Sequence, residues 1–126
     1  ALPTMHGIRM TRQIDGQEVV KDAMVNQHCG TSIGMIADCR KDDAVWEVPY
    51  GSLLPRNVEN LLVAGRCSAA EDYAWQVTRL MQGAALTGQA AGVAAGMAVR
   101  ARTSPAKLDV ADVQKGMESR GQSLHV

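Results

Sequence analysis

The feature that most constrains this chain is an uncharged stretch of small residues in its second half. Residues 83–99 read GAALTGQAAGVAAGMAV. Gly88, Gly92 and Gly96 recur at every fourth position, which places them on one face of a helix. Each glycine costs about 1 kcal/mol relative to alanine inside a helix, so another group must approach this face closely to offset the loss. The sequence therefore predicts a helix over about 83–101 with a close neighbour along its glycine face.

Two kinds of neighbour would explain this face. One is a sheet or helix packed tightly on it, which accounts well for Gly92 and Gly96. The other is a ligand that meets the first helical turn around Gly88, Gln89 and Ala90, where a helix start also favours negative charge. Both explanations stay open at this point.

A second feature is the apolar run 61–64, which stops at Gly65 and is predicted to be a buried strand. Ligands of α/β proteins sit at the carboxyl ends of strands, so the next residues are candidates for a binding site. Arg66 is expected to contact a phosphate or to form an ordinary ion pair. Cys67 is either a redox thiol or a small packing residue. Arg79 lies among apolar residues and is expected to face inward, toward a substrate anion or a structural carboxylate.

The remaining pattern predicts an α+β fold, with short strands followed by Ala/Gly-rich helices. Helical spacing marks 71–81, and a last helix is predicted over about 109–120, with Asp109 as its N-cap. The composition shifts near 44–60, from a β-rich polar part to an alanine-rich helical part. Short strands or apolar runs are predicted at 7–14, 17–20, 35–37 and 45–50.

Composition excludes several classes of function. Thirteen basic and thirteen acidic residues give no net charge, so nothing favours nucleic acid or an anionic membrane surface as a partner. The stretch 83–99 is too short and too rich in Ala and Gly to predict a membrane span. The chain has no Phe, two Trp and two Tyr, and this shortage of large packing residues favours a piece that packs against another domain or subunit.

Cysteine and histidine usage points to neither disulfides nor a metal. The three cysteines form no C-x-x-C pair, which favours a reducing compartment, and a cytoplasmic location is expected. His28, Cys29 and Cys39 are the candidate ligands, but no ligand pair has the spacing of a structural zinc site, so no metal is predicted. His125 lies near the C-terminal end and is expected to be solvated.

Taken together, several of these segments resemble a known family. Residues 46–55 (WEVPYGSLLP), 60–68 (NLLVAGRCS), Arg79 and 88–95 (GQAAGVAA) are similar in order and spacing to the C-terminal portion of FAD-dependent oxidoreductases. The resemblance extends over about 7–120. It implies the C-terminal part of a Rossmann-type FAD-binding fold, with the G-x-G-x-x-G fingerprint in sequence that is absent here.

The resemblance implies a division into two parts. Residues 1–50 would belong to a substrate or cap domain, and residues 51–126 to the C-terminal segment of the FAD-binding domain. The implied partners are the missing N-terminal part of the same protein and a small-molecule substrate. The chain alone is then expected to bind little FAD and to associate with itself through apolar surface.

The resemblance also implies a set of cofactor residues. The helix from about Gly88 would point at the flavin ring, and Gly65 with Arg66 would approach the ribitol and diphosphate. Many flavoproteins have an acidic residue at the position of Arg66, so this chain departs from the pattern there. The complete implied set is Gly65, Arg66, Cys67, Arg79, Gly88, Gln89, Ala90 and Ala91.

Two other functions compete with the flavoprotein hypothesis. One is a non-enzymatic α+β interaction module that docks through its Gly/Ala-rich helix. The other is a thiol-redox protein that uses Cys67.

Overall fold

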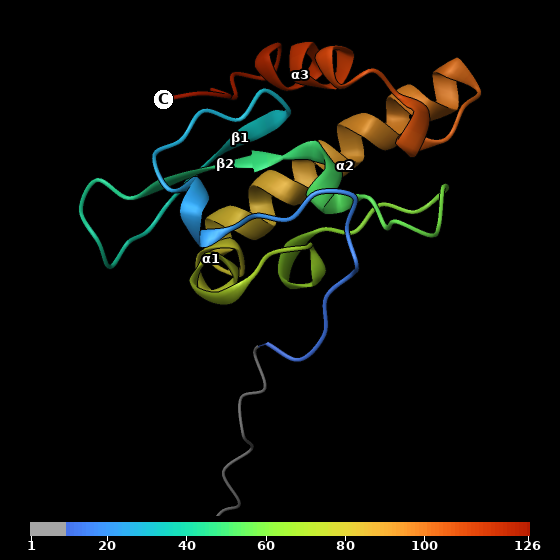
Figure 1. Cartoon of the computed structure of the whole chain (residues 1–126). Coiled ribbons are helices and arrows are strands. Elements are labelled where there is room, and N and C mark those ends of the chain that lie inside the picture. Colours follow the sequence, from blue (N-terminus) through green and yellow to red (C-terminus); the bar gives the residue numbers. More distant parts are fainter. Residues whose placement is uncertain (1–9) are drawn as a thin grey trace, which may run out of the picture.

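The computed structural model describes residues 10–126, which form an α+β fold with two antiparallel strands and three α-helices (Figure 1). Short 3-10 turns connect these elements. The strands are β1 (Ser32–Ala37) and β2 (Val45–Pro49), and the helices are α1 (Asp72–Thr78), α2 (Met81–Ala101) and α3 (Val110–Glu118). The 3-10 turns are Asp22–Met24, Tyr50–Leu53, Gly65–Cys67 and Pro105–Lys107.

The centre of the fold is the hairpin of β1 and β2. Its register pairs Met35 with Glu47, and a bulge lies between Ser32 and Met35. Gly34 sits in this bulge with a φ of 144°, and a Cβ there would lie 2.5 Å from Leu86 Cδ1 of α2. Glycine is therefore needed at position 34 for two reasons: it adopts the irregular backbone of the bulge, and it leaves room for the close approach of α2.

The helices complete the core around this hairpin. In Figure 1, α2 crosses behind the hairpin, α3 lies along the upper edge, and α1 lies beside the beginning of α2. One buried cluster joins residues on both sides of position 50, among them Val20, Ile36, Val48, Val77, Val93, Val113 and Leu124. The proposed division of the chain at this position stays a prediction.

α2 lies where the sequence predicts a helix, but it begins two residues earlier than expected, at Met81. α3 is capped as predicted, because Asp109 Oδ1 accepts a hydrogen bond of 2.9 Å from the Ala111 N–H. Val113 and Met117 are its buried face. Within residues 10–126, no helix is long and apolar enough to cross a membrane.

The strand expected at 61–64 is not formed in this structure. Leu61 is exposed, and the Val63 N–H donates to the Leu53 carbonyl over 2.9 Å instead of joining a sheet. A strand needs a neighbour that satisfies its backbone groups, and the described residues contain only the β1–β2 sheet. The strand predicted at 17–20 is also not formed, since this segment makes one isolated bridge, between Val20 and Ala70. Of the strand predicted at 7–14, residues 7–9 lie outside the described residues and 10–14 form no strand.

The tight packing predicted at Gly92 and Gly96 occurs at other glycines. A Cβ at Gly92 would meet nothing within 4 Å, and one at Gly96 would only touch Arg100 Nη1 at 3.5 Å. By contrast, a Cβ at Gly83 would overlap the Thr78 carbonyl, and one at Gly116 would lie 2.8 Å from Val93 Cγ1. Among residues 10–126, close packing on α2 therefore occurs away from Gly92 and Gly96, and no neighbour of their face is found there.

Candidate functional site

The turn at Gly65–Cys67 packs against the first half of α2. The Gly65 N–H donates to Thr87 Oγ1 over 2.8 Å, and the Thr87 hydroxyl donates to the Gly83 carbonyl over 2.6 Å. Gly65 has a φ of 72°, a conformation that favours glycine, whereas a Cβ there would make only ordinary contact with Ala84. The buried Thr87 thus fixes this turn to the helix.

Hydrogen bonds also hold the carbonyls of this turn. The Ser68 hydroxyl donates to the Gly65 carbonyl, and Trp75 Nε1 donates to the Arg66 carbonyl over 2.9 Å. The Cys67 carbonyl accepts from the Ile14 N–H. The backbone of the turn is therefore fixed, and the side chains that it presents are the available groups.

Those side chains are exposed. Among the described residues, the Arg66 guanidinium forms no ion pair, and Cys67 is a free, exposed cysteine. Cys67 therefore does not pack in the core that residues 10–126 form. The thiol also has no partner cysteine, since the cysteines of residues 10–126 are all free.

The face of α2 beside this turn is uncovered. Gly88, Gln89 and Gly92 are exposed, and a Cβ at Gly88 would meet nothing within 4 Å. Met81 and Val99 are also exposed, with 89% and 78% of their surface accessible. The predicted neighbour of the glycine face is therefore absent from the described part of the chain.

Two of the residues predicted beside Gly88 point elsewhere. Ala90 has no exposed surface and packs in the core, and the partly buried Ala91 packs against the same core. Ala90 lies on the opposite side of the helix from Gly88, because two positions turn the direction of a side chain by about 200°. Ala91, three positions from Gly88, is turned by only about 60° toward the core, which agrees with its partial burial. Gln89 remains on the exposed surface.

The predicted first turn of the helix is also misplaced. α2 begins at Met81, so Gly88 lies about two turns inside the helix. The helix dipole acts mainly within the first turn, which leaves Gly88 outside its range. Any role of Gly88 has to come from its missing side chain.

Arg79 lies between α1 and α2, at the C-cap of α1. Its Nε is buried and has no hydrogen-bond partner. The inward orientation predicted for this side chain agrees with the buried Nε. The anion or carboxylate expected to pair with it is not found among residues 10–126.

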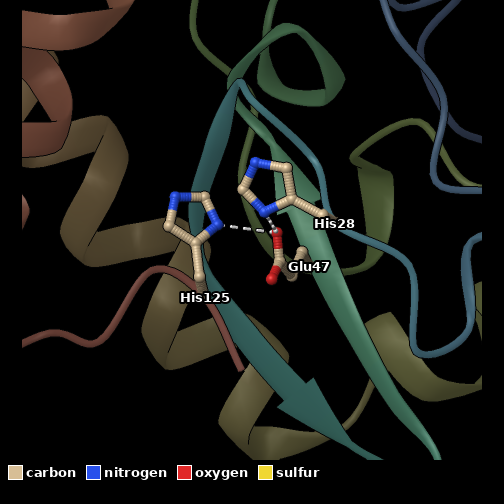
Figure 2. Close-up of side chains that lie close together, drawn as sticks. All are labelled: His28, Glu47 and His125. Atoms are coloured by element: carbon tan, nitrogen blue, oxygen red, sulfur yellow. Dashed lines mark hydrogen bonds and ion pairs between the residues drawn. The ribbon is translucent and has the colours of Figure 1, made fainter.

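A second group of polar side chains gathers on the opposite part of the fold. His28 precedes β1, Glu47 lies on β2, and His125 follows α3 (Figure 2). The Glu47 carboxylate is 3% exposed, and its Oε2 lies 2.8 Å from His125 Nδ1 and 3.7 Å from His28 Nδ1. The two imidazole rings are 4.4 Å apart between centroids.

Backbone groups fix the Glu47 carboxylate. The Cys29 N–H donates to Oε2 over 2.7 Å, and the Val126 N–H donates to Oε1 over 3.2 Å. Burial raises the pKa of Glu47, but the hydrogen bonds from Cys29, His125 and Val126 outweigh it and hold the pKa below its ordinary value. Glu47 is therefore a buried carboxylate that stays ionised.

No signal in the sequence marks this group of side chains. Its members come from three segments far apart in the chain, so no local spacing marks them. His125, which is predicted to be solvated, keeps 37% of its side-chain surface exposed and is also bonded to Glu47. The prediction of no metal site relied on zinc-like spacing, which does not apply to ligands brought together only by the fold.

The comparison with protein families agrees with the resemblance found in the sequence. The family model described as FAD dependent oxidoreductase matches residues 1–117. This match covers most of the chain, and the chain belongs to the FAD-dependent oxidoreductase family. No curated protein and no solved structure gave a significant match.

Proposed function

We propose that this chain forms one side of the FAD site of a flavoprotein oxidoreductase, and that the rest of the site lies in another part of the same protein. The observation that carries the proposal is the hydrogen bond from the Gly65 N–H to Thr87. It holds the Gly65–Cys67 turn beside the part of α2 where Gly88 and Gly92 are exposed and uncovered.

The residues present fit one wall of a dinucleotide site. The missing side chains at Gly88 and Gly92 leave room for a flat group to lie against the helix backbone. The exposed Arg66 guanidinium suits a diphosphate, which it can bind through two parallel hydrogen bonds. The Gly65 N–H is already bonded to Thr87, so Gly65 would shape the turn rather than bind the cofactor directly.

Other features support a missing neighbour. The buried Arg79 Nε has no partner within the described residues, as expected where an anionic group of another segment is absent. The exposed Met81 and Val99 extend the uncovered face along α2. The same face would let copies of this chain associate when the rest of the protein is missing.

The wider arrangement follows from the same proposal. Residues 51–126 would be the C-terminal segment of a Rossmann-type FAD domain, and residues 1–50 part of a substrate or cap domain. Bound FAD supplies the hydride or electron transfer, and a small molecule is the substrate. This chain's own residues would orient the cofactor, and Arg66 would offset the negative charge of the diphosphate.

The test compares two glycines of α2 in the intact flavoprotein. We expect Gly88→Ala to lower the FAD content per protein, because its new methyl group lies on the cofactor side. Gly96→Ala is the matched control and should keep the FAD content. Both substitutions should raise helix stability by up to about 1 kcal/mol, so melting curves separate loss of flavin from loss of fold. Full FAD content in Gly88→Ala would contradict the proposed position of the cofactor.

A further inference from the structure

We propose that His28, Glu47 and His125 form a binding site for a divalent first-row transition metal, for which Zn²⁺ is the probe. One ligand atom from each residue lies within 4.8 Å of the others. Figure 2 shows the three side chains pointing toward one another, with Glu47 between the two rings. This site is separate from the proposed FAD surface and goes beyond the proposed function.

The distances suit a metal ion. Two ligands at about 2.0–2.1 Å from a tetrahedral zinc ion are about 3.3 Å apart. The two histidine nitrogens lie 2.8 Å and 3.7 Å from Glu47 Oε2, one below and one above that separation. All three ligand atoms lie within 4.8 Å of one another, so side-chain rotations that draw the two histidine nitrogens toward a shared ion would complete the set.

The carboxylate is already positioned for this role. Glu47 is buried, and hydrogen bonds from the Cys29 and Val126 N–H groups hold both of its oxygens. Such second contacts orient metal ligands and are part of what gives natural sites their affinity. The buried negative charge also gains a compensating cation when a metal binds.

The donor set selects the class of metal. Two imidazole nitrogens and one carboxylate suit zinc and its neighbours, whereas calcium and magnesium prefer oxygen ligands alone. The His28 side chain is 71% exposed and that of His125 is 37% exposed, so solvent reaches the ion from this side. Three protein ligands leave a fourth position for water or another exchangeable ligand.

The competing explanation is a hydrogen-bonded cluster that only fastens the C-terminal segment to the hairpin. His125 and Val126 both bond to Glu47, and the Leu124 carbonyl accepts from the Ser32 hydroxyl over 2.6 Å. This role requires His125 but not the exposed His28, whose nitrogen is 3.7 Å from the carboxylate. His28 therefore distinguishes the two explanations.

The experiment titrates the metal-free 126-residue chain with Zn²⁺ by calorimetry, and with Co²⁺ by absorption spectroscopy. We expect one Zn²⁺ per chain and a rise in melting temperature, since a ligand that binds the folded state stabilises it. His28→Ala should weaken Zn²⁺ binding by at least about tenfold. Removing a residue that only supports a metal ligand already costs about this much affinity, and His28 is proposed as a ligand itself. Its melting temperature without metal should be unchanged, because the side chain is exposed.

The control is His6→Ala, which removes a histidine outside the described residues and should bind Zn²⁺ like the unchanged chain. The Co²⁺ spectrum should lack the thiolate charge-transfer band that Cys29, Cys39 or Cys67 would produce. Three results would overturn the proposal: no one-to-one Zn²⁺ binding, equal affinity in His28→Ala, or a spectrum dominated by thiolate ligands.

Discussion

Gly65 donates its backbone N–H to the buried hydroxyl of Thr87, over 2.8 Å. This single bond joins the turn that carries Arg66 to the helix that carries the exposed glycines. Thr87 has no exposed surface, and its own proton is donated to the Gly83 carbonyl. Thr87 therefore links two backbone segments by hydrogen bonds, inside the core and next to the proposed cofactor surface.

Replacing Thr87 by valine, its closest apolar analogue, tests how much these hydrogen bonds contribute to stability. Thr87→Val keeps the shape of the side chain but leaves the Gly65 N–H without its acceptor. We expect the free energy of unfolding to fall by about 1 kcal/mol, because the partly buried Gly65 N–H loses its acceptor. Denaturant unfolding measures the change. Thr87→Ser keeps the hydroxyl and should lose less; an equal loss in both variants would show that the methyl group, and not the hydrogen bond, matters.

The packed and unpacked glycines predict opposite effects of the same substitution. At Gly116, a Cβ would lie 2.8 Å from Val93 Cγ1, and a β-branched side chain in a helix cannot easily turn away. Overpacking should outweigh the gain in helix propensity, so Gly116→Ala should lower the free energy of unfolding by about 1–2 kcal/mol. Gly92→Ala meets no neighbour and should raise it by up to about 1 kcal/mol. Changes of the same sign in denaturant unfolding would contradict this assignment of faces.

Local signals in the sequence predicted the helices well. Helix α2 is marked by its uncharged run, and α3 by its N-cap Asp109. Both signals involve residues only a few positions apart, so they can be read from the sequence without knowledge of the fold. The bond from Gly65 to Thr87 joins the turn to α2, whereas the cofactor contacts that the family resemblance implies for both segments stay predictions. That bond itself, between residues far apart in sequence, left no local signal.

Features that depend on distant partners could not be predicted in this way. The run 61–64 is apolar enough for a strand, but the described residues offer it no strand to pair with. The spacing of the α2 glycines indicated one face of a helix without indicating whether that face is covered. The same limit explains why the cluster of His28, Glu47 and His125 was missed, since only the fold brings these residues together.

The N-terminus of α1 is capped from a distant segment. The N-cap residue Glu71 makes no capping bond with its side chain, but Asp22 accepts from the Ala74 N–H over 2.6 Å and from the Tyr73 N–H over 3.3 Å. Asp22→Ala should therefore cost about 0.5–2 kcal/mol of unfolding free energy, as for an ordinary N-cap. The control is Asp42, which is exposed and makes no hydrogen bond in the described structure. Asp42→Ala should change the free energy of unfolding by no more than about 0.5 kcal/mol. Equal stability of the two variants in urea would show that the cap is not needed.

Acid should weaken the contact between the β1–β2 connection and α1. The Asp38 carboxylate accepts from the Tyr73 hydroxyl and from Arg40 Nε at 2.9 Å. The bond from Tyr73 is the largest influence, and with Arg40 it outweighs burial and lowers the pKa of Asp38 from 3.8 to about 2. A depressed pKa in the folded state stabilises the fold above the unfolded-state value, and this stabilisation is lost as the pH falls from about 4 to about 2.

Tyr73→Phe isolates this contribution, because it removes the hydroxyl donor and keeps the ring. Without that donor, the pKa of Asp38 should move back toward its ordinary value. The melting temperature of the variant should lie below that of the unchanged chain near neutral pH. The difference should shrink as the pH falls through the interval in which Asp38 takes up its proton. Melting curves recorded across this interval test the expectation, and a constant difference at every pH would show that Tyr73 acts through packing and not through the Asp38 carboxylate.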